Sequence, residues 1–196
     1  MNVTHYILVG LSLLAFASCS ENDDTVEEFP DWKNKNEQYF EAAYQSHNYD
    51  YALRKYSLSE EAPSSASDYV LVDVLGSGDA NETASPYLND SVEVHYSGRL
   101  IPSTTYTTGY EFDKSYLEPF DEDTAIPRKF MVNGVVTGFG TALQKMHRGD
   151  YWRVTIPYQL GYGAVDMTSG GIPAYSTLVF DIRLVDFWTT TRGDRD

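Results

Sequence analysis

The side chains in this chain that could do chemistry are mainly aromatic. Its 196 residues include 16 tyrosines and 9 phenylalanines, but only one cysteine and four histidines. His47, His95 and His147 do not have the spacing of metal ligands, and no Ser/His/Asp set of a known motif type occurs. The Gly-Ser-Gly run at residues 76–78 lacks the third glycine of a dinucleotide loop and predicts a turn. The residue types therefore favour aromatic packing or an aromatic-lined site.

The charge balance excludes whole classes of partner. Lys and Arg number 14 against 29 Asp and Glu, which gives a formal net charge of −15. Nucleic-acid binding depends on Lys and Arg that neutralise phosphates, so no nucleic-acid partner is expected. The same charge opposes electrostatic docking on anionic lipid, so membrane contact would need a covalent or apolar anchor.

The N-terminus offers such an anchor. Residues 6–17 form an apolar run of signal-peptide length, too short for a spanning helix of about 20 residues. The run ends in Phe16-Ala17-Ser18-Cys19, which resembles the lipobox of bacterial lipoproteins, although Phe16 replaces leucine and the start carries no Lys or Arg. This resemblance implies cleavage before Cys19, acylation of its sulfur and an outer-membrane lipoprotein in the cell envelope. The alternative is a removed signal peptide with an incidental cysteine.

The next segment predicts a helix on a tether. Residues 20–28 are polar and acidic, without apolar periodicity, which is typical of a flexible tether. Residues 30–47 predict an amphipathic helix whose apolar face carries Trp32, Tyr39, Phe40, Ala43 and Tyr44. We expect this helix to pack on the domain that follows, or else to pair with a second subunit. Residues 60–67, with Pro63 and several serines, predict a linker.

From Asp68 onward the sequence predicts short strands. The expected strands are 69–75, 91–96, 150–156 and 177–186, the second ending in a turn at Ser97-Gly98. A short helix is expected over 141–146, with Gly149 helping to end it. Several strands, one short helix and no βαβ rhythm indicate an antiparallel α+β domain. The expected organisation is a signal peptide (1–18), an acidic tether with the amphipathic helix (19–67), the main domain (68–188) and a polar tail (189–196).

Three stretches, in order along the chain, resemble the FKBP family of peptidyl-prolyl cis/trans isomerases. They are residues 92–100 with His-Tyr-Ser-Gly, residues 109–115 with Gly-Tyr-Glu-Phe-Asp-Lys-Ser, and residues 129–187 with Ile-Pro, Tyr-Gly and Leu-Val-Phe-Asp. The resemblance covers residues 69–187. It implies a half-barrel, in which an antiparallel sheet curls around one short helix and leaves an apolar cleft between them.

The resemblance also implies which residues line the cleft. Carried over position by position, they are Tyr96, Phe112, Asp113, Val135, Val136, Phe139, Tyr162, Ile172 and Phe180. Three positions depart from the family pattern. Phe139 stands where tryptophan is usual, Arg128 stands where a further pocket phenylalanine is expected, and Gly171 replaces an apolar residue at the rim. Phe120 in the lengthened loop is a candidate substitute for that missing phenylalanine.

The implied reaction is rotation about X–Pro bonds, with proline-containing polypeptides as partners and with no cofactor. The family pattern assigns the Val136 N–H and the Tyr162 hydroxyl to substrate carbonyls, and Asp113 either to Tyr96 or to the substrate carbonyl. Binding of macrolide inhibitors is also implied, and the departures predict that it is weak. His95 faces away from Tyr96 along the strand and is expected to be structural.

Three functions remain open from the sequence. The first is an isomerase that helps exported or surface proteins to fold. The second is a non-catalytic FKBP-like binding module or chaperone, which the Arg128 and Phe139 departures favour. The third is a surface adhesin or assembly subunit in which helix 30–47 is the working part. Without the family pattern, Phe112, Val136 and Phe180 would be assigned to the core, and Asp113 to a turn.

Overall fold

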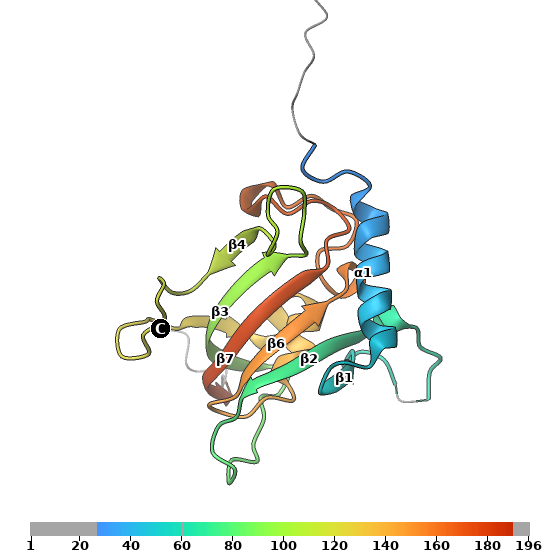
Figure 1. The fold of residues 1–196 in the computed structure, drawn as a ribbon. Coiled ribbons are helices and arrows are strands. Elements are labelled where there is room, and N and C mark those ends of the chain that lie inside the picture. The colour runs from blue at the N-terminus through green and yellow to red at the C-terminus, as the bar shows by residue number, and fades with distance from the viewer. Residues whose placement is uncertain (1–26, 60, 190–196) are drawn as a thin grey trace, which may run out of the picture.

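A seven-stranded sheet forms the body of the structure, a computed structural model that describes residues 27–59 and 61–189 (Figure 1). The strands run in the order β1-β2-β6-β7-β3-β4, and β5 also pairs with β3. Every pairing is antiparallel. The strands are β1 (Tyr51–Arg54), β2 (Tyr69–Gly76), β3 (Asp90–Leu100), β4 (Glu111–Lys114), β5 (Arg128–Met131), β6 (Tyr151–Ile156) and β7 (Leu178–Thr189).

Two α-helices accompany the sheet, α1 (Trp32–Ser46) and α2 (Thr137–Leu143). Four short 3₁₀ turns, η1 (Ala66–Asp68), η2 (Val132–Gly134), η3 (Tyr158–Leu160) and η4 (Thr168–Gly170), lie in the connections. Strand β6 alternates half-buried and buried residues, as a strand with one core face must. The α+β class expected from the sequence is confirmed.

Helix α2 lies earlier in the chain than the helix expected over 141–146. Its residues from Gly138 to Leu143 are all buried. The reason is tertiary packing, because a Cβ at Gly138 would lie 2.3 Å from Ile156 Cγ2, so only glycine lets the helix approach the sheet this closely. Gly138 and Gly140 weaken the local helix signal, and packing outweighs that loss.

The turn expected at Ser97-Gly98 is absent, and β3 runs on through both residues to Leu100. Gly98 pairs with Phe180 of β7 two residues before the end of the longest ladder of the sheet. A Cβ at Gly98 would lie 2.5 Å from Phe180 Cε1 and 2.7 Å from Phe112 Cε2. The glycine is therefore required by the two rings above it, and it does not mark a turn.

Three strands, β1, β4 and β5, were not expected from the sequence. Each has four residues, too few for alternation to be recognised, and each lies at the margin of the sheet. Because β1 pairs with β2, the sheet already includes residues 51–54, ahead of the boundary expected at residue 68. At the other end β7 continues to Thr189, one residue into the expected tail.

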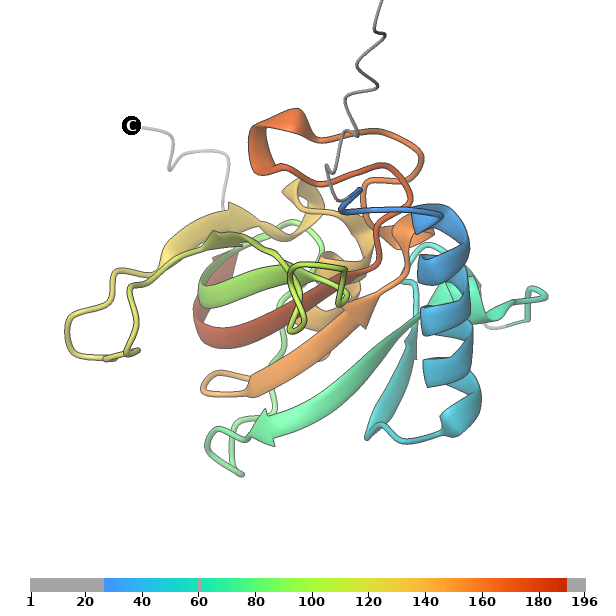
Figure 2. The same ribbon diagram turned by 45° about the horizontal axis from the view of Figure 1, so that its top comes forward.

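Helix α1 confirms the helix expected over residues 30–47, and it packs on its own domain. Figures 1 and 2 show it beside the end of β6 and the loop that joins β6 to β7. Its buried residues are Trp32, Asn36 and Phe40. Tyr39 was expected on this face but is 40% exposed. The buried stripe centres between positions 36 and 40, which leaves residue 39 at its margin.

Cys19, the expected signal peptide and most of the expected tail lie outside the described residues. Within the part of the chain that the structure describes, neither α-helix is long and apolar enough to cross a bilayer.

Candidate active site

A pocket of about 450 Å³ opens between β4, β5, the start of α2 and the loop that joins β6 to β7. All nine residues assigned to the cleft from the sequence lie in its lining. The structure adds residues that the sequence reasoning missed, namely Phe130, Gly134, Met167, Ser169 and Gly170. The nine predicted side chains come from five different parts of the chain, and the fold brings them to one place.

Four aromatic rings form the deep part of the pocket. Phe139 of α2 meets Phe180 of β7 edge to face, with ring centroids 5.1 Å apart and an angle of 90° between the planes. The Tyr96 ring lies 6.2 Å from each of these two rings. Phe112 of β4 packs against Phe180 at 5.5 Å. Such edge-to-face contacts hold rings in fixed orientations, so the pocket has a preformed apolar wall.

One hydrogen-bonded pair lies in this wall. The Tyr96 hydroxyl donates to Asp113 Oδ2 at 2.5 Å. Burial, followed by the bond to Asp113, raises the pKa of Tyr96 well above its usual range. The Tyr96 hydroxyl therefore stays protonated and remains a donor at any physiological pH. Of the two roles that the sequence left open for Asp113, orientation of Tyr96 is the one with a contact in the structure.

Tyr162 places a second hydroxyl at the pocket. Tyr162 is 36% exposed, so it lines the pocket and is also in contact with solvent. Burial, followed by the negative charge of Asp113, raises the pKa of Tyr162. This hydroxyl is also neutral and able to donate to a carbonyl.

Val136 stands at the entry to α2. It is the residue before the first turn, and its carbonyl accepts the Gly140 N–H at 3.1 Å. The first N–H groups of a helix have no acceptor within the helix, so a ligand carbonyl could accept from this end. The side chains of Val135 and Val136 are half-buried in the pocket lining.

Phe120 does not replace the missing pocket phenylalanine, which corrects that expectation. Its ring packs edge-on against His95 at 5.2 Å, and His95 faces away from Tyr96 because neighbouring strand residues alternate. Phe130 supplies the ring instead, with its centroid 5.8 Å from that of Tyr96. It lies two residues after exposed Arg128, on the same face of β5, and this alternation is the signal that could have found it.

The expected structural role of His95 agrees with its surroundings. The residue is 3% exposed, and burial lowers the pKa of its imidazole. His95 is not among the residues that line the pocket.

The loop over residues 157–177, called the rim loop below, forms the outer wall. The backbones of Met167 and Ile172 bond to each other in both directions, at 2.8 and 3.2 Å. Gly171 has φ of 65°, and a Cβ there would lie 3.3 Å from the Tyr110 ring. The left-handed backbone explains why glycine replaces the apolar residue that the family pattern has at this position.

No group of three or more His, Cys, Asp or Glu residues with metal-binding geometry occurs in residues 27–59 and 61–189. The pocket lining contains one acid, two hydroxyl-bearing rings and one serine, and its other members are apolar residues and glycines.

Comparison with known proteins places the chain in a family. A profile described as FKBP-type peptidyl-prolyl cis-trans isomerase matches residues 82–185, which is more than half of the chain. The "Macrophage infectivity potentiator" of Trypanosoma cruzi is 41% identical over 111 residues, covering 56% of this chain and 49% of that protein. The "FKBP-type 22 kDa peptidyl-prolyl cis-trans isomerase" of Escherichia coli is 39% identical over 105 residues, covering 54% and 45%.

Solved structures agree with this placement. A peptidyl-prolyl cis-trans isomerase of Pseudomonas syringae superposes with a TM-score of 0.55 at 27% identity, covering 78% of this chain and 91% of that one. FkpA of Escherichia coli gives a TM-score of 0.55 at 26% identity, covering 81% and 62%. The chain spans about half the length of the curated relatives that it matches. On its profile match, its fold and its aromatic pocket, the chain belongs to the FKBP-type peptidyl-prolyl cis-trans isomerase family.

Proposed function

We propose that this protein catalyses cis-trans isomerisation of X–Pro bonds in polypeptides, at the pocket between β4, β5, α2 and the rim loop. The observation that carries the proposal is the convergence of four aromatic rings, one of which is Tyr96 bonded to Asp113, in a member of this family. The reaction requires no nucleophile and no proton carrier, and no titrating group in the pocket is assigned such a role.

The proposed mechanism uses the change in polarity of the peptide bond. Resonance gives the C–N bond partial double-bond character and a rotation barrier of about 18–20 kcal/mol. At the twisted transition state this resonance is lost, and the carbonyl loses part of its dipole. A pocket that is apolar and excludes water stabilises the twisted amide more than the planar one. A rate increase of about ten-thousandfold needs roughly 5.5 kcal/mol of such differential stabilisation.

The pocket residues divide into two roles. The rings of Tyr96, Phe112, Phe139 and Phe180 hold the proline ring, and Val135, Val136 and Ile172 exclude water from it. The Val136 N–H and the Tyr162 hydroxyl donate hydrogen bonds to substrate carbonyls. These bonds determine which of the two parts of the substrate joined by the X–Pro bond rotates. Asp113 keeps the Tyr96 hydroxyl pointed at its own carboxylate, so this ring is held in one orientation.

The wider setting belongs to the same proposal. Cys19 would carry a lipid that holds the protein in the cell envelope as an outer-membrane lipoprotein, and the substrates would be exported or surface proteins in the course of folding. The apolar run before Cys19 and the acidic stretch after it support this placement. Macrolide inhibitors would bind weakly, because Phe139 is smaller than the usual tryptophan and Arg128 is exposed.

A binding module without catalysis is the second candidate, and the same two positions favour it. Exchange NMR on a Leu-Pro peptide separates the two functions, because it reports binding and interconversion in one sample. An isomerase merges the cis and trans signals at substoichiometric protein concentration. A binding module shifts the peptide signals without accelerating their exchange, and that result would contradict the proposed function.

A further inference from the structure

Helix α1 lies outside the region matched by the family profile, yet its buried face contacts the rim loop. The rim loop, residues 157–177, contributes the side chains of Tyr162, Met167 and Ile172 to the lining of the pocket. Four successive contacts join α1 to the two ends of this loop. They place the helix where it can set the shape of the pocket without touching a substrate.

The first contact is a buried hydrogen-bond chain. The indole Nε1 of Trp32 donates to Ser176 Oγ at 2.8 Å, and Ser176 Oγ donates to the carbonyl oxygen of Pro173 at 2.7 Å. Trp32 is 7% exposed and Ser176 is 3% exposed, so water does not compete for these groups. Pro173 follows Ile172 directly, so this series of hydrogen bonds ends one residue from a side chain that lines the pocket.

The second contact is the amide of Asn36, which is fully buried. Its Nδ2 donates to the Trp32 carbonyl oxygen at 2.7 Å, and its Oδ1 accepts the backbone N–H of Thr177 at 2.7 Å. A buried amide is tolerated only where its donor and acceptor are satisfied. Asn36 is therefore placed to join one turn of α1 to the last residue of the rim loop.

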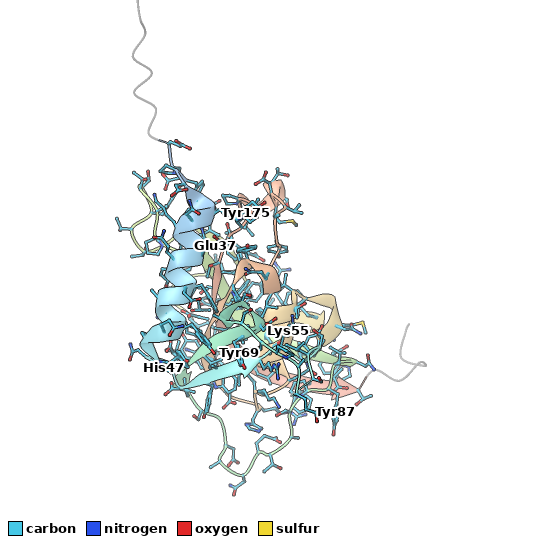
Figure 3. All side chains as sticks on the ribbon, turned by 90° about the vertical axis from the view of Figure 1, so that its right-hand side faces the viewer. Glu37, His47, Lys55, Tyr69, Tyr87 and Tyr175 are labelled. Carbon is cyan, nitrogen blue, oxygen red and sulfur yellow. The ribbon has the colours of Figure 1, made fainter. Side chains whose placement is uncertain are left out.

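The third and fourth contacts lie one helical position further round. The Tyr158 hydroxyl donates to Glu37 Oε1 at 3.0 Å, and Lys33 Nζ lies 5.1 Å from the centroid of the Tyr175 ring. Figure 3 shows Glu37 on the helix next to Tyr175. The rings of Tyr158 and Tyr175 pack edge to face at 5.2 Å, which joins the two ends of the rim loop to each other.

The backbone of Tyr175 is itself held in an uncommon conformation. Its φ is 63°, a left-handed value that bulky residues rarely adopt. Such a residue persists where its surroundings determine it, and here these are the Tyr158 ring and Lys33. Tyr175 donates its N–H to the Gly163 carbonyl oxygen at 2.8 Å, next to Tyr162.

We propose that Trp32 and Asn36 are positioning residues for the pocket. In this proposal α1 braces the rim loop so that Tyr162 stays in place to hold a substrate carbonyl and Ile172 stays in place to exclude water. The proposal rests on the proposed isomerase function. Without the brace, the rim loop would spend only part of its time in the binding shape, and the apparent affinity for peptide would fall by that fraction. The turnover of bound peptide would stay the same.

The test uses Trp32→Phe in the full chain, which keeps an aromatic ring and removes only the N–H donor. Loss of one hydrogen bond raises the ratio of unbraced to braced rim loop roughly fivefold, so we expect KM for a Leu-Pro peptide to rise by up to that factor, with kcat within about twofold of the wild type. Ser176→Ala removes this bond from the loop side together with the bond to Pro173, and it is expected to raise KM by at least as much. Tyr39→Phe, on the exposed side of α1, is the matched control with unchanged kinetics.

Amide hydrogen exchange is measured on the same variants without peptide. We expect faster exchange in residues 158–177 of Trp32→Phe, with β3 and β7 unchanged. Val74→Ala, which truncates a half-buried residue of β2 that packs against the core outside the rim loop, gives the pattern of general destabilisation for comparison. Wild-type exchange in the rim loop of both Trp32→Phe and Ser176→Ala, or an increase that matches Val74→Ala, would overturn the brace. Exchange does not depend on catalysis, so an inactive wild type would refute the isomerase proposal and leave this test valid.

Discussion

At the scale of single residues, Asp113 is the one acid in the pocket lining, and it combines a short hydrogen bond from Tyr96 with an exposed carboxylate. Asp113→Asn preserves shape and an acceptor oxygen but removes the charge that strengthens the bond. We expect kcat/KM for a Leu-Pro peptide to fall roughly fivefold. Because solvent screens an exposed charge, the free energy of unfolding should change by less than about 1 kcal/mol.

Tyr162→Phe is the companion change, since it removes one hydroxyl and leaves the ring. Its proposed role is to hold a substrate carbonyl, so we expect a similar loss of kcat/KM with an unaltered melting temperature. Peptide kinetics and thermal melts measured in parallel show whether kcat/KM falls without a loss of stability. Wild-type rates from both folded variants would mean that the active site lies elsewhere.

At the scale of elements, the critical contact is between Gly98, near the C-terminal end of β3, and the rings of Phe112 and Phe180. Gly98→Ala would place a Cβ 2.5 Å from Phe180 Cε1, so the pocket rings must move. We expect a loss of about 1–3 kcal/mol in unfolding free energy, as for other overpacked sites, together with a lower kcat/KM. Urea unfolding measures the first and peptide kinetics the second.

Gly76→Ala serves as the matched control for that prediction. Its Cβ would meet the Tyr151 Cβ at an ordinary 3.5 Å, at the end of β2 and away from the pocket lining. It should change neither quantity by more than the measurement error. If Gly98→Ala were as stable and active as Gly76→Ala, the close approach described for β3 would be wrong.

How far the elements could be predicted depended on length and on local signals. Strand β6 was predicted almost to the residue, because six residues alternate cleanly between core and surface. Strands β4 and β5 have four residues each, and it is the pairing with β3 that defines them. Helix α2 was misplaced because Gly138 and Gly140, which weaken the helix signal, are there for close packing. A single sequence contains no information on such long-range fits.

The pocket was easier to predict than the helix contacts. Its nine residues followed from the family resemblance, since family order along the chain stands in for spatial order. Phe130 was missed because the resemblance drew attention to Arg128. The bond between Asn36 and Thr177 could not be predicted, because it joins residues 141 positions apart and an asparagine on an apolar helix face has no special sequence signal.

At the scale of the whole molecule, the net charge and the single cysteine bear on where the protein is held. Because the protein has a net charge of −15, anionic lipid repels it, and its attachment to a membrane should depend on a covalent anchor. We expect Cys19→Ser to move the protein from the membrane fraction to the soluble fraction of cells. Ser20→Ala, the neighbouring control, should stay with the membrane. Equal membrane retention of Cys19→Ser would contradict the lipoprotein assignment.

The most direct test of the central claim is the isomerisation rate of a Leu-Pro peptide with catalytic amounts of the purified protein. We predict a first-order rate that increases linearly with protein concentration above the spontaneous rate. A Glu-Pro peptide should react more slowly, because an apolar wall and the Asp113 charge both disfavour a carboxylate there. Rates equal to the spontaneous rate at every protein concentration, from a folded protein, would contradict the account.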